Sequence, residues 1–297
     1  MVSFLPALPS FRSLRKRFVL RSEPVSDRDA INLGRIIAHQ LSSLDSKNLD
    51  DYGFSVFSQW DEDGIIQRLV QLLPDIPRTF IELGVEDYRE SNTRFLLMKD
   101  NWNGFVVDGD RKNVEAIRSS YYFWKYELQA KAHFLTRENI NSVVQESGFG
   151  REVGILSIDL DGVDYHILEA INGMMPWILV CEYNALMGSE EAVTVPYRSD
   201  FNRTSAHYSN LYWGASLAAF EHVAEKFGMV LVGVNSAGNN AFFVRAAHLP
   251  KSLRRLTVKE AFKEASFREG RDEVGNLTLV RSSGQGFPFG MPLERIG

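Results

Sequence analysis

Carboxylate residues lie at the ends of four of the apolar, strand-like segments of the chain. The four endings read Glu82-Leu-Gly84, Asp108-Gly-Asp110, Asp159-Leu-Asp161-Gly162 and Glu182-Tyr-Asn184. In a doubly wound sheet the ligand lies at the carboxyl ends of the central strands. We therefore expect these acids to share one site. Carboxylates in such a site can bind a ribose diol, hold a divalent cation or accept a proton from a hydroxyl.

The acid that ends the second strand is typical of ribose recognition, because a carboxylate can accept hydrogen bonds from both hydroxyls of the diol. Asp108 is the first candidate for this role and Asp110 is the second. The alternative is a helix cap for the segment that begins at Arg111, and this suits Asp110 better than Asp108. Gly84 would let the backbone approach the ligand closely.

The loop after the first strand is acidic, because Glu82, Glu86 and Asp87 all lie in or beside it. The pyrophosphate of a dinucleotide needs backbone amides and no nearby carboxylate. S-adenosylmethionine has no phosphate and carries a sulfonium cation and an ammonium group. The loop therefore favours S-adenosylmethionine over NAD as the ligand.

The acids after the fourth and fifth strands suggest how a hydroxyl could be activated. Asp159, Asp161 and Glu182 could converge on Mg²⁺ or Mn²⁺, since oxygen ligands suit these ions. Alternatively no metal binds, Asp159 braces the next helix and Asp161 contacts the cofactor. A general base is then needed, and the candidates are Asp161, Asp164 and His166, with His166 the least favoured because it falls in a segment that reads as helical.

Strand-like and helical segments alternate from residue 79 onward, which predicts a mostly parallel sheet covered on both faces. We expect strands at 79–83, 104–108, 132–135, 153–159, 178–182, 229–234 and 241–244, and helices at 113–119, 138–146, 165–171 and 215–227. Only residues 235–240 join the last two strands, too few for a parallel crossover, so the final strand should be antiparallel. The predicted fold is α/β: a doubly wound, seven-stranded, Rossmann-like sheet of the class I methyltransferase type.

Outside this domain, predicted to span residues 51–250, we expect an N-terminal helical extension (1–50) and a C-terminal extension (251–297). Basic and apolar residues mix near the N-terminus, from Phe11 to Arg21. This segment is interpreted as a basic tail, and the alternative is peripheral contact with an anionic membrane surface.

The amino-acid composition bears on the binding partners and on the location of the protein. The 297 residues carry a net charge of -5, which gives no electrostatic footprint for nucleic acid. A single cysteine, Cys181, excludes a disulfide framework and fits a reducing, cytoplasmic location. No apolar run is long enough to cross a bilayer. The composition does not decide between a monomer and a homo-oligomer.

Three stretches in order resemble the FkbM-type methyltransferases: "FIELGVEDYRESNTRFLL", "NWNGFVVDGDRKNVEAIR" and "ILSIDLDGVDYHILEAI". The upstream "FSQWDEDGII" is similar to the Ser-Gln-x-x-Glu-Asp segment of that family, and the resemblance spans roughly residues 57–245. It implies S-adenosylmethionine-dependent O-methylation of a small-molecule or glycan hydroxyl, as in polysaccharide biosynthesis. It also adds Gln59 and Asn92 to the cofactor-binding candidates Glu82, Gly84, Asp108, Asp110 and Asp159. An NAD-type oxidoreductase and a non-catalytic cofactor-binding module are the alternatives.

Overall fold

The computed structural model describes residues 25–281 and 287–297 of the chain. The basic segment near the N-terminus lies outside these residues. Within the described part, no helix is both long and apolar enough to span a membrane.

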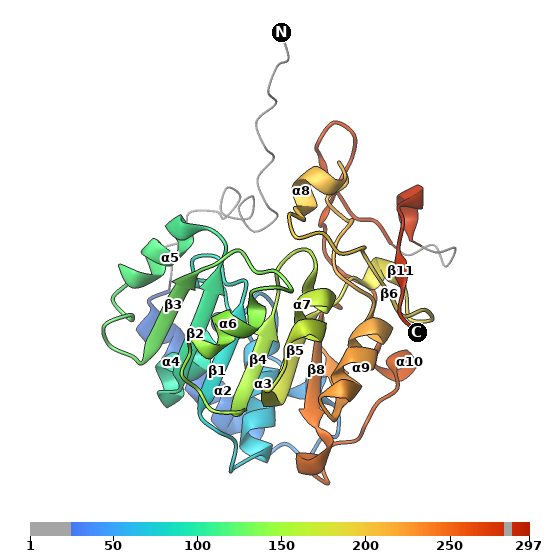
Figure 1. The fold of residues 1–297 in the computed structure, drawn as a ribbon. Helices are drawn as coiled ribbons and strands as arrows, with labels where there is room; N and C mark the ends of the chain where they lie inside the picture. Colours follow the sequence, from blue (N-terminus) through green and yellow to red (C-terminus); the bar gives the residue numbers. More distant parts are fainter. Residues whose placement is uncertain (1–24, 282–286) are drawn as a thin grey trace.

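A seven-stranded sheet forms the centre of the molecule, with strand order β3-β2-β1-β4-β5-β8-β7 (Figure 1). Its strands are β1 (Thr79–Leu83), β2 (Asn103–Asp108), β3 (Leu128–Ala132), β4 (Glu152–Ile158), β5 (Met175–Glu182), β7 (Met229–Val234) and β8 (Asn240–Arg245). β1 to β5 pair in parallel, whereas β8 runs antiparallel to both of its neighbours, β5 and β7. This confirms the predicted fold class, including the antiparallel final strand.

Helices cover both faces of the sheet, and each face has its own apolar core. Successive residues of β1 point to opposite faces, so Phe80 lies in one core and Ile81 in the other. The Phe80 core includes residues of α2 (Asp27–Ser42), α3 (Glu62–Leu72), α4 (Arg94–Asp100) and α5 (Arg111–Arg118). The Ile81 core includes residues of α6 (Ile140–Gln145), α7 (Asp164–Ala170), α9 (Leu217–Lys226) and α10 (Val258–Ala261).

The third strand was predicted at the wrong place. It occupies Leu128–Ala132, where Leu128 pairs with Gly104 and Ala132 with Asp108, and not residues 132–135. β3 is an edge strand with the polar residues Gln129 and Lys131, so its apolar signal is short. The apolar residues just after it were mistaken for the strand.

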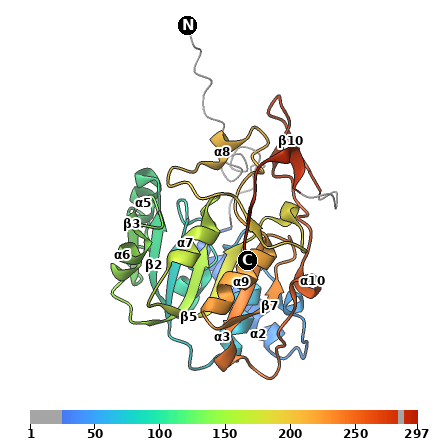
Figure 2. The ribbon, with the colours of Figure 1, turned by 45° about the vertical axis from the view of Figure 1, so that its right-hand side comes forward.

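The segments on either side of the central domain both contact it. Asp27 of α2 forms an ion pair with Arg94 of α4. At the other end of the chain, β11 (Glu294–Arg295) pairs with β6 (Val193–Thr194), and β9 (Gly270–Arg271) pairs with β10 (Leu277–Thr278). α8 (Arg203–Ala206) and β10 lie above the sheet (Figure 2). The C-terminal residues therefore pair with a strand of the central domain, β6.

Candidate functional site

An open pocket lies at the carboxyl ends of β1, β2 and β4, as the strand-end acids predicted. Its empty volume is about 670 Å³, including the part open to solvent. It is lined by Gly84, Glu86, Val107, Asp108, Gly109, His133, Phe134, Leu135, Asp159, Leu160, Asp161, Gly162, Val163 and Phe201. Its lining combines apolar side chains with a few polar groups, as in sites that orient a small organic ligand.

Asp108 is fixed at the floor of this pocket by three hydrogen bonds. Its Oδ2 accepts from the backbone N–H of Glu86 at 2.7 Å, and its Oδ1 accepts from the N–H of Asp110 at 2.8 Å and from Asn113 Nδ2 at 3.0 Å. A carboxylate oxygen can accept about two hydrogen bonds, so Oδ2 can accept another from a ligand hydroxyl. The Asp108 carboxylate is therefore held in one orientation at the pocket.

Asp110 is the N-cap of α5, which confirms the alternative interpretation of this residue. Its side chain accepts from the backbone N–H of Lys112 at 2.9 Å and satisfies one of the free donors of the first helical turn. Asp110 is not among the described residues that line the pocket.

Gly84 is required by the fold itself. Its φ is +84°, and a Cβ at this position would lie 1.8 Å from the backbone oxygen of Asp159. The ends of β1 and β4 therefore approach each other more closely than any side chain would allow. Gly84 also lines the pocket, and its predicted contact with a ligand stays a prediction.

Glu82 and Asn92 brace the loop beside the pocket. The Glu82 carboxylate accepts from the backbone N–H of Asn92 at 2.9 Å and from the Ser91 hydroxyl at 2.7 Å. Asn92 Nδ2 donates to the Ser157 hydroxyl of β4 at 3.1 Å. Neither Glu82 nor Asn92 belongs to the described lining. These contacts tie the acidic loop to the sheet.

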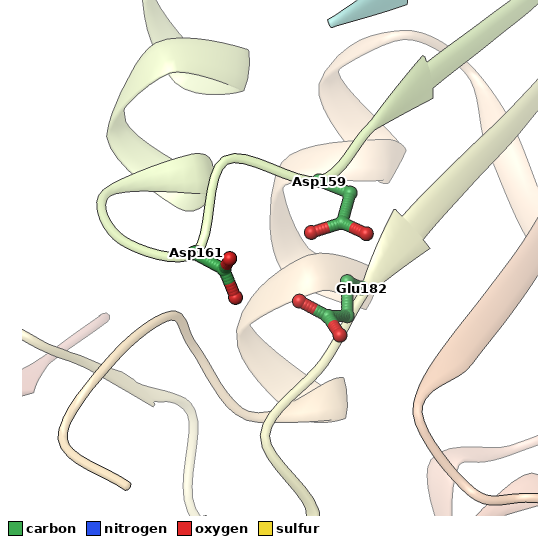
Figure 3. Close-up of side chains that lie close together, drawn as sticks. All are labelled: Asp159, Asp161 and Glu182. Carbon is green, nitrogen blue, oxygen red and sulfur yellow. The ribbon is translucent and has the colours of Figure 1, made fainter. Parts of the chain in front are cut away.

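The side chains of Asp159, Asp161 and Glu182 converge at the ends of β4 and β5, as predicted (Figure 3). One carboxylate oxygen from each lies within 4.8 Å of the others. Like charges at such separations repel strongly unless a cation or proton compensates them. Three carboxylates are a donor set that fits Mg²⁺ or Mn²⁺.

A buried arginine that the sequence did not reveal contributes positive charge to this cluster. Arg203 of α8 forms ion pairs with Asp161 through Nη1 and with Glu269 through Nη2. Its guanidinium also lies over the ring of Trp213, with Arg203 Cζ 4.6 Å from the ring centroid. Arg203 is 42 residues from Asp161 and 66 from Glu269, and its helix is four residues long. No local pattern could have predicted this arrangement.

Asp164 has a positioning role in the structure. Its carboxylate accepts from the backbone N–H groups of Leu160 at 2.6 Å and of Gly162 at 3.0 Å. Burial raises the pKa of Asp164 to about 7, and the charge of Asp159 contributes. These bonds hold the loop that carries Asp161, whose φ of +56° is in the left-handed region. Asp164 is absent from the described pocket lining.

His166 is likewise away from the pocket. It is buried, and its Nε2 lies 2.9 Å from the carbonyl oxygen of Val195, to which it donates as the Nε2-H tautomer. Burial lowers the pKa of His166. Of the three predicted base candidates, Asp161 is the one that the structure brings to the pocket.

Gln59 approaches the acidic cluster through Asn239. Asn239, in the loop between β7 and β8, has its Nδ2 3.5 Å from Gln59 Oε1 and 3.4 Å from Glu182 Oε1. Gln59 is thus linked to Glu182 through Asn239, and it is not in the described pocket lining. Its predicted contact with the cofactor stays a prediction.

Aromatic residues in the pocket were also missed. Phe134 is 57% exposed and, like Leu135, follows β3 beside Asp108. Because the sequence pattern assigned these residues to a strand, they were not considered as ligand contacts. An exposed phenylalanine offers a flat apolar surface on which a planar base could stack.

No family model and no curated protein matches the chain. Several solved structures are similar. The N-terminal domain of EvdMO1 with SAH bound is 13% identical, with a TM-score of 0.42, covering 75% of this chain and 98% of that one. An O-methyltransferase from Bacillus cereus in complex with SAH is 11% identical, with a TM-score of 0.40, covering 78% and 94%. A putative O-methyltransferase from Klebsiella pneumoniae is 11% identical, with a TM-score of 0.41, covering 79% and 96%. Similarity at this level says nothing about what this chain binds or modifies.

Proposed function

We propose that this chain is an S-adenosylmethionine-dependent O-methyltransferase that acts on a hydroxyl of a glycan or of a glycosylated small molecule. One observation carries the proposal. In a sheet with an antiparallel strand β8, Asp108, the residue that we propose to bind the ribose, lines the same pocket as Asp159 and Asp161. The residue proposed to bind the ribose and the acids proposed to face the sulfonium end therefore line one pocket.

The pocket matches the parts of this cofactor. The ribose would bind Asp108, and the adenine would lie against Phe134 and Leu135, beside it. The cationic methionine end would then lie toward Gly84 and Asp159. Carboxylates stabilise sulfonium and ammonium charges, whereas they would repel a pyrophosphate. The charge of this end of the pocket therefore favours the proposed cofactor over NAD.

In the proposed reaction the acceptor oxygen attacks the methyl carbon while the bond from carbon to sulfur breaks. The hydroxyl proton must leave during or before this step. Asp161, which lines the pocket, is the carboxylate that we assign to accept it, but carboxylates in general are weak bases for an alcohol hydroxyl. Mg²⁺ or Mn²⁺ held by Asp159, Asp161 and Glu182 would supply the missing activation by lowering the pKa of a coordinated hydroxyl. We include this metal in the proposal.

Calorimetric titration separates this function from its alternatives. S-adenosylhomocysteine should bind the purified chain with a stoichiometry near one, and NAD should give no heat of binding. Tight binding of NAD with no response to S-adenosylhomocysteine would instead support an oxidoreductase. Binding of S-adenosylhomocysteine without any methyl transfer to a broad set of glycans would favour the non-catalytic module.

A cytoplasmic location, peripheral membrane contact and a homo-oligomeric state belong to the proposal as expectations. The membrane contact would involve the basic segment around residues 11–21, which lies outside the described residues. The acceptor is expected to be a small molecule or glycan and not a nucleic acid, because the net charge is -5.

A further inference from the structure

A second pocket adjoins the one described above. Its empty volume is about 600 Å³, including the part open to solvent. It shares Phe134, Leu160, Asp161 and Phe201 with the first pocket and is completed by Asn202, Arg203, Thr204 and Asn210. The two pockets therefore meet at Asp161. A molecule in the second pocket would lie beside the acidic cluster on which methyl transfer is proposed to depend.

The lining of this second pocket combines aromatic rings with short polar side chains. Phe134 and Phe201 offer apolar ring surfaces, against which the C–H face of a sugar ring can pack. The Thr204 hydroxyl donates to Asn202 Oδ1 at 2.7 Å, which leaves a Thr204 lone pair to accept from a sugar hydroxyl and the Asn202 amide N–H groups to donate to one. A few polar groups among apolar rings is the composition expected of a site that orients a small polar molecule.

The polar wall of the second pocket is fixed in advance. Arg203 Nε donates to the backbone oxygen of Asn210 at 2.6 Å, while its other nitrogens bond Asp161 and Glu269. The Asn202 side chain accepts from the Ser205 N–H at 3.1 Å and caps α8. Side chains that are already ordered lose little entropy on binding, so such a wall is suited to recognition.

The charges around the second pocket argue against an anionic acceptor. The positive charge of Arg203 is already compensated by Asp161 and Glu269. Arg271 lies close enough that Arg203 lowers its pKa, in addition to the effect of burial. Two further carboxylates, Asp159 and Glu182, lie in the acidic cluster beside Asp161. Among these side chains, a carboxylate or phosphate on the acceptor would meet more negative than positive charge, and a divalent ion in the acidic cluster would bring their sum only to neutrality.

We propose that the second pocket is the acceptor site and that it takes an uncharged sugar ring. The inference rests on the proposed methyltransferase function and adds the location and the charge class of the acceptor. In the reaction, the sugar oxygen gains the methyl group as the carbon–sulfur bond of the cofactor breaks. The sulfur keeps the electron pair of that bond and becomes a neutral thioether. The hydroxyl proton passes to Asp161 and then to water.

The test measures sugar binding to the protein loaded with S-adenosylhomocysteine, by saturation-transfer difference NMR. The probes are the methyl glycosides of glucose, mannose, galactose and fucose, with the methyl glycoside of glucuronic acid as the charged probe. Thr204→Trp fills the second pocket, and Ser205→Trp adds the same bulk to an exposed neighbour on α8. Thr204→Val removes one hydroxyl at nearly constant shape. All proteins are also titrated with S-adenosylhomocysteine alone.

We expect at least one neutral glycoside to bind wild type and Ser205→Trp equally and to lose binding in Thr204→Trp. Thr204→Val should weaken it about threefold to tenfold, the scale of one neutral hydrogen bond. S-adenosylhomocysteine affinity should be the same in all four proteins. Equal glycoside binding by wild type and Thr204→Trp, preferential binding of the glucuronoside, or no binding of any glycoside would each overturn the inference. Failure of wild type to bind S-adenosylhomocysteine would instead reject the proposed function.

Discussion

At the scale of single residues, aspartates that are near neighbours in sequence differ in role, both in the pair Asp108 and Asp110 and in the pair Asp161 and Asp164. Asp108 faces the pocket, Asp110 caps α5, and Asp164 holds the loop that carries Asp161. The sequence placed Asp108 and Asp110 because strand ends and helix caps are local features. It could not separate Asp161 from Asp164, because their difference depends on burial and on Arg203, which comes from a distant part of the chain.

The first prediction compares Asp108 with its neighbour Asp110. Asp108→Ala should weaken S-adenosylmethionine binding by about 1.5–3 kcal/mol, the scale of a hydrogen bond to a charged group. Asp110→Ala is the matched control: it should lower the free energy of unfolding by about 1 kcal/mol through the lost helix cap and leave binding unchanged. Calorimetry and urea denaturation provide the two readouts. Unchanged cofactor affinity in Asp108→Ala would show that the ribose binds elsewhere.

The second prediction concerns Asp164 and pH. Its pKa is about 7 in the folded protein and about 4 in an unfolded chain, so the folded state holds the proton more tightly. Its favourable contribution to stability is fully present below about pH 4 and is lost as pH rises through about 7. Replacing Asp164 by Asn removes this contribution.

The measurement for Asp164 is urea denaturation of wild type and Asp164→Asn at about pH 5 and about pH 8. The free energy of unfolding of wild type relative to the variant should fall between the lower and the higher pH. A difference between the two proteins that stays constant, or that grows with pH, would mean that Asp164 is ionised at both values.

At the scale of elements, most strands of the sheet could be predicted from the sequence, whereas the edge strand β3 and the short helix α8 could not. The short connection between β7 and β8 was enough to predict an antiparallel strand, because a parallel crossover needs more chain. The edge strand β3 was misplaced, since a strand with polar residues gives little apolar signal. α8, with four residues, is too short for a helical period to be recognised.

The third prediction concerns the carboxylates that end β4 and β5. If Asp159, Asp161 and Glu182 hold a divalent ion, EDTA should abolish methyl transfer and leave S-adenosylmethionine binding largely intact. Mg²⁺ or Mn²⁺ should restore transfer, since oxygen ligands prefer these ions. Glu182→Gln should behave like EDTA treatment, because the amide keeps the shape and loses the charge. Full activity of exhaustively chelated enzyme would end the metal proposal and leave Asp161 as the base.

At the scale of the whole molecule, the ends of the chain contribute differently to the site. The C-terminal residues reach the candidate site, since Glu269 bonds Arg203 beside Asp161. The sequence alone indicates no role for residues 251–297, because the contact of Glu269 with Arg203 forms only when the chain is folded. The N-terminal residues before α2 precede every strand of the sheet in sequence.

The fourth prediction concerns these N-terminal residues. Deleting residues 1–21 should leave methyl transfer to a dissolved acceptor unchanged and should reduce sedimentation with vesicles rich in anionic lipid at low salt. A matched variant with Arg12, Arg15, Lys16, Arg17 and Arg21 changed to Gln separates charge from length. A large loss of transfer in the deletion would show that this segment forms part of the site.

A crystal structure with S-adenosylhomocysteine and Mn²⁺ would show directly whether this pocket binds S-adenosylmethionine beside a metal ion. We expect the ribose hydroxyls to bond the Asp108 carboxylate, the adenine to lie beside Phe134, and the sulfur to lie nearest Asp159 and Asp161. The anomalous signal of manganese should lie among Asp159, Asp161 and Glu182. Cofactor density that avoids Asp108, or a pocket left empty at saturating ligand, would contradict the assignment of this pocket to S-adenosylmethionine.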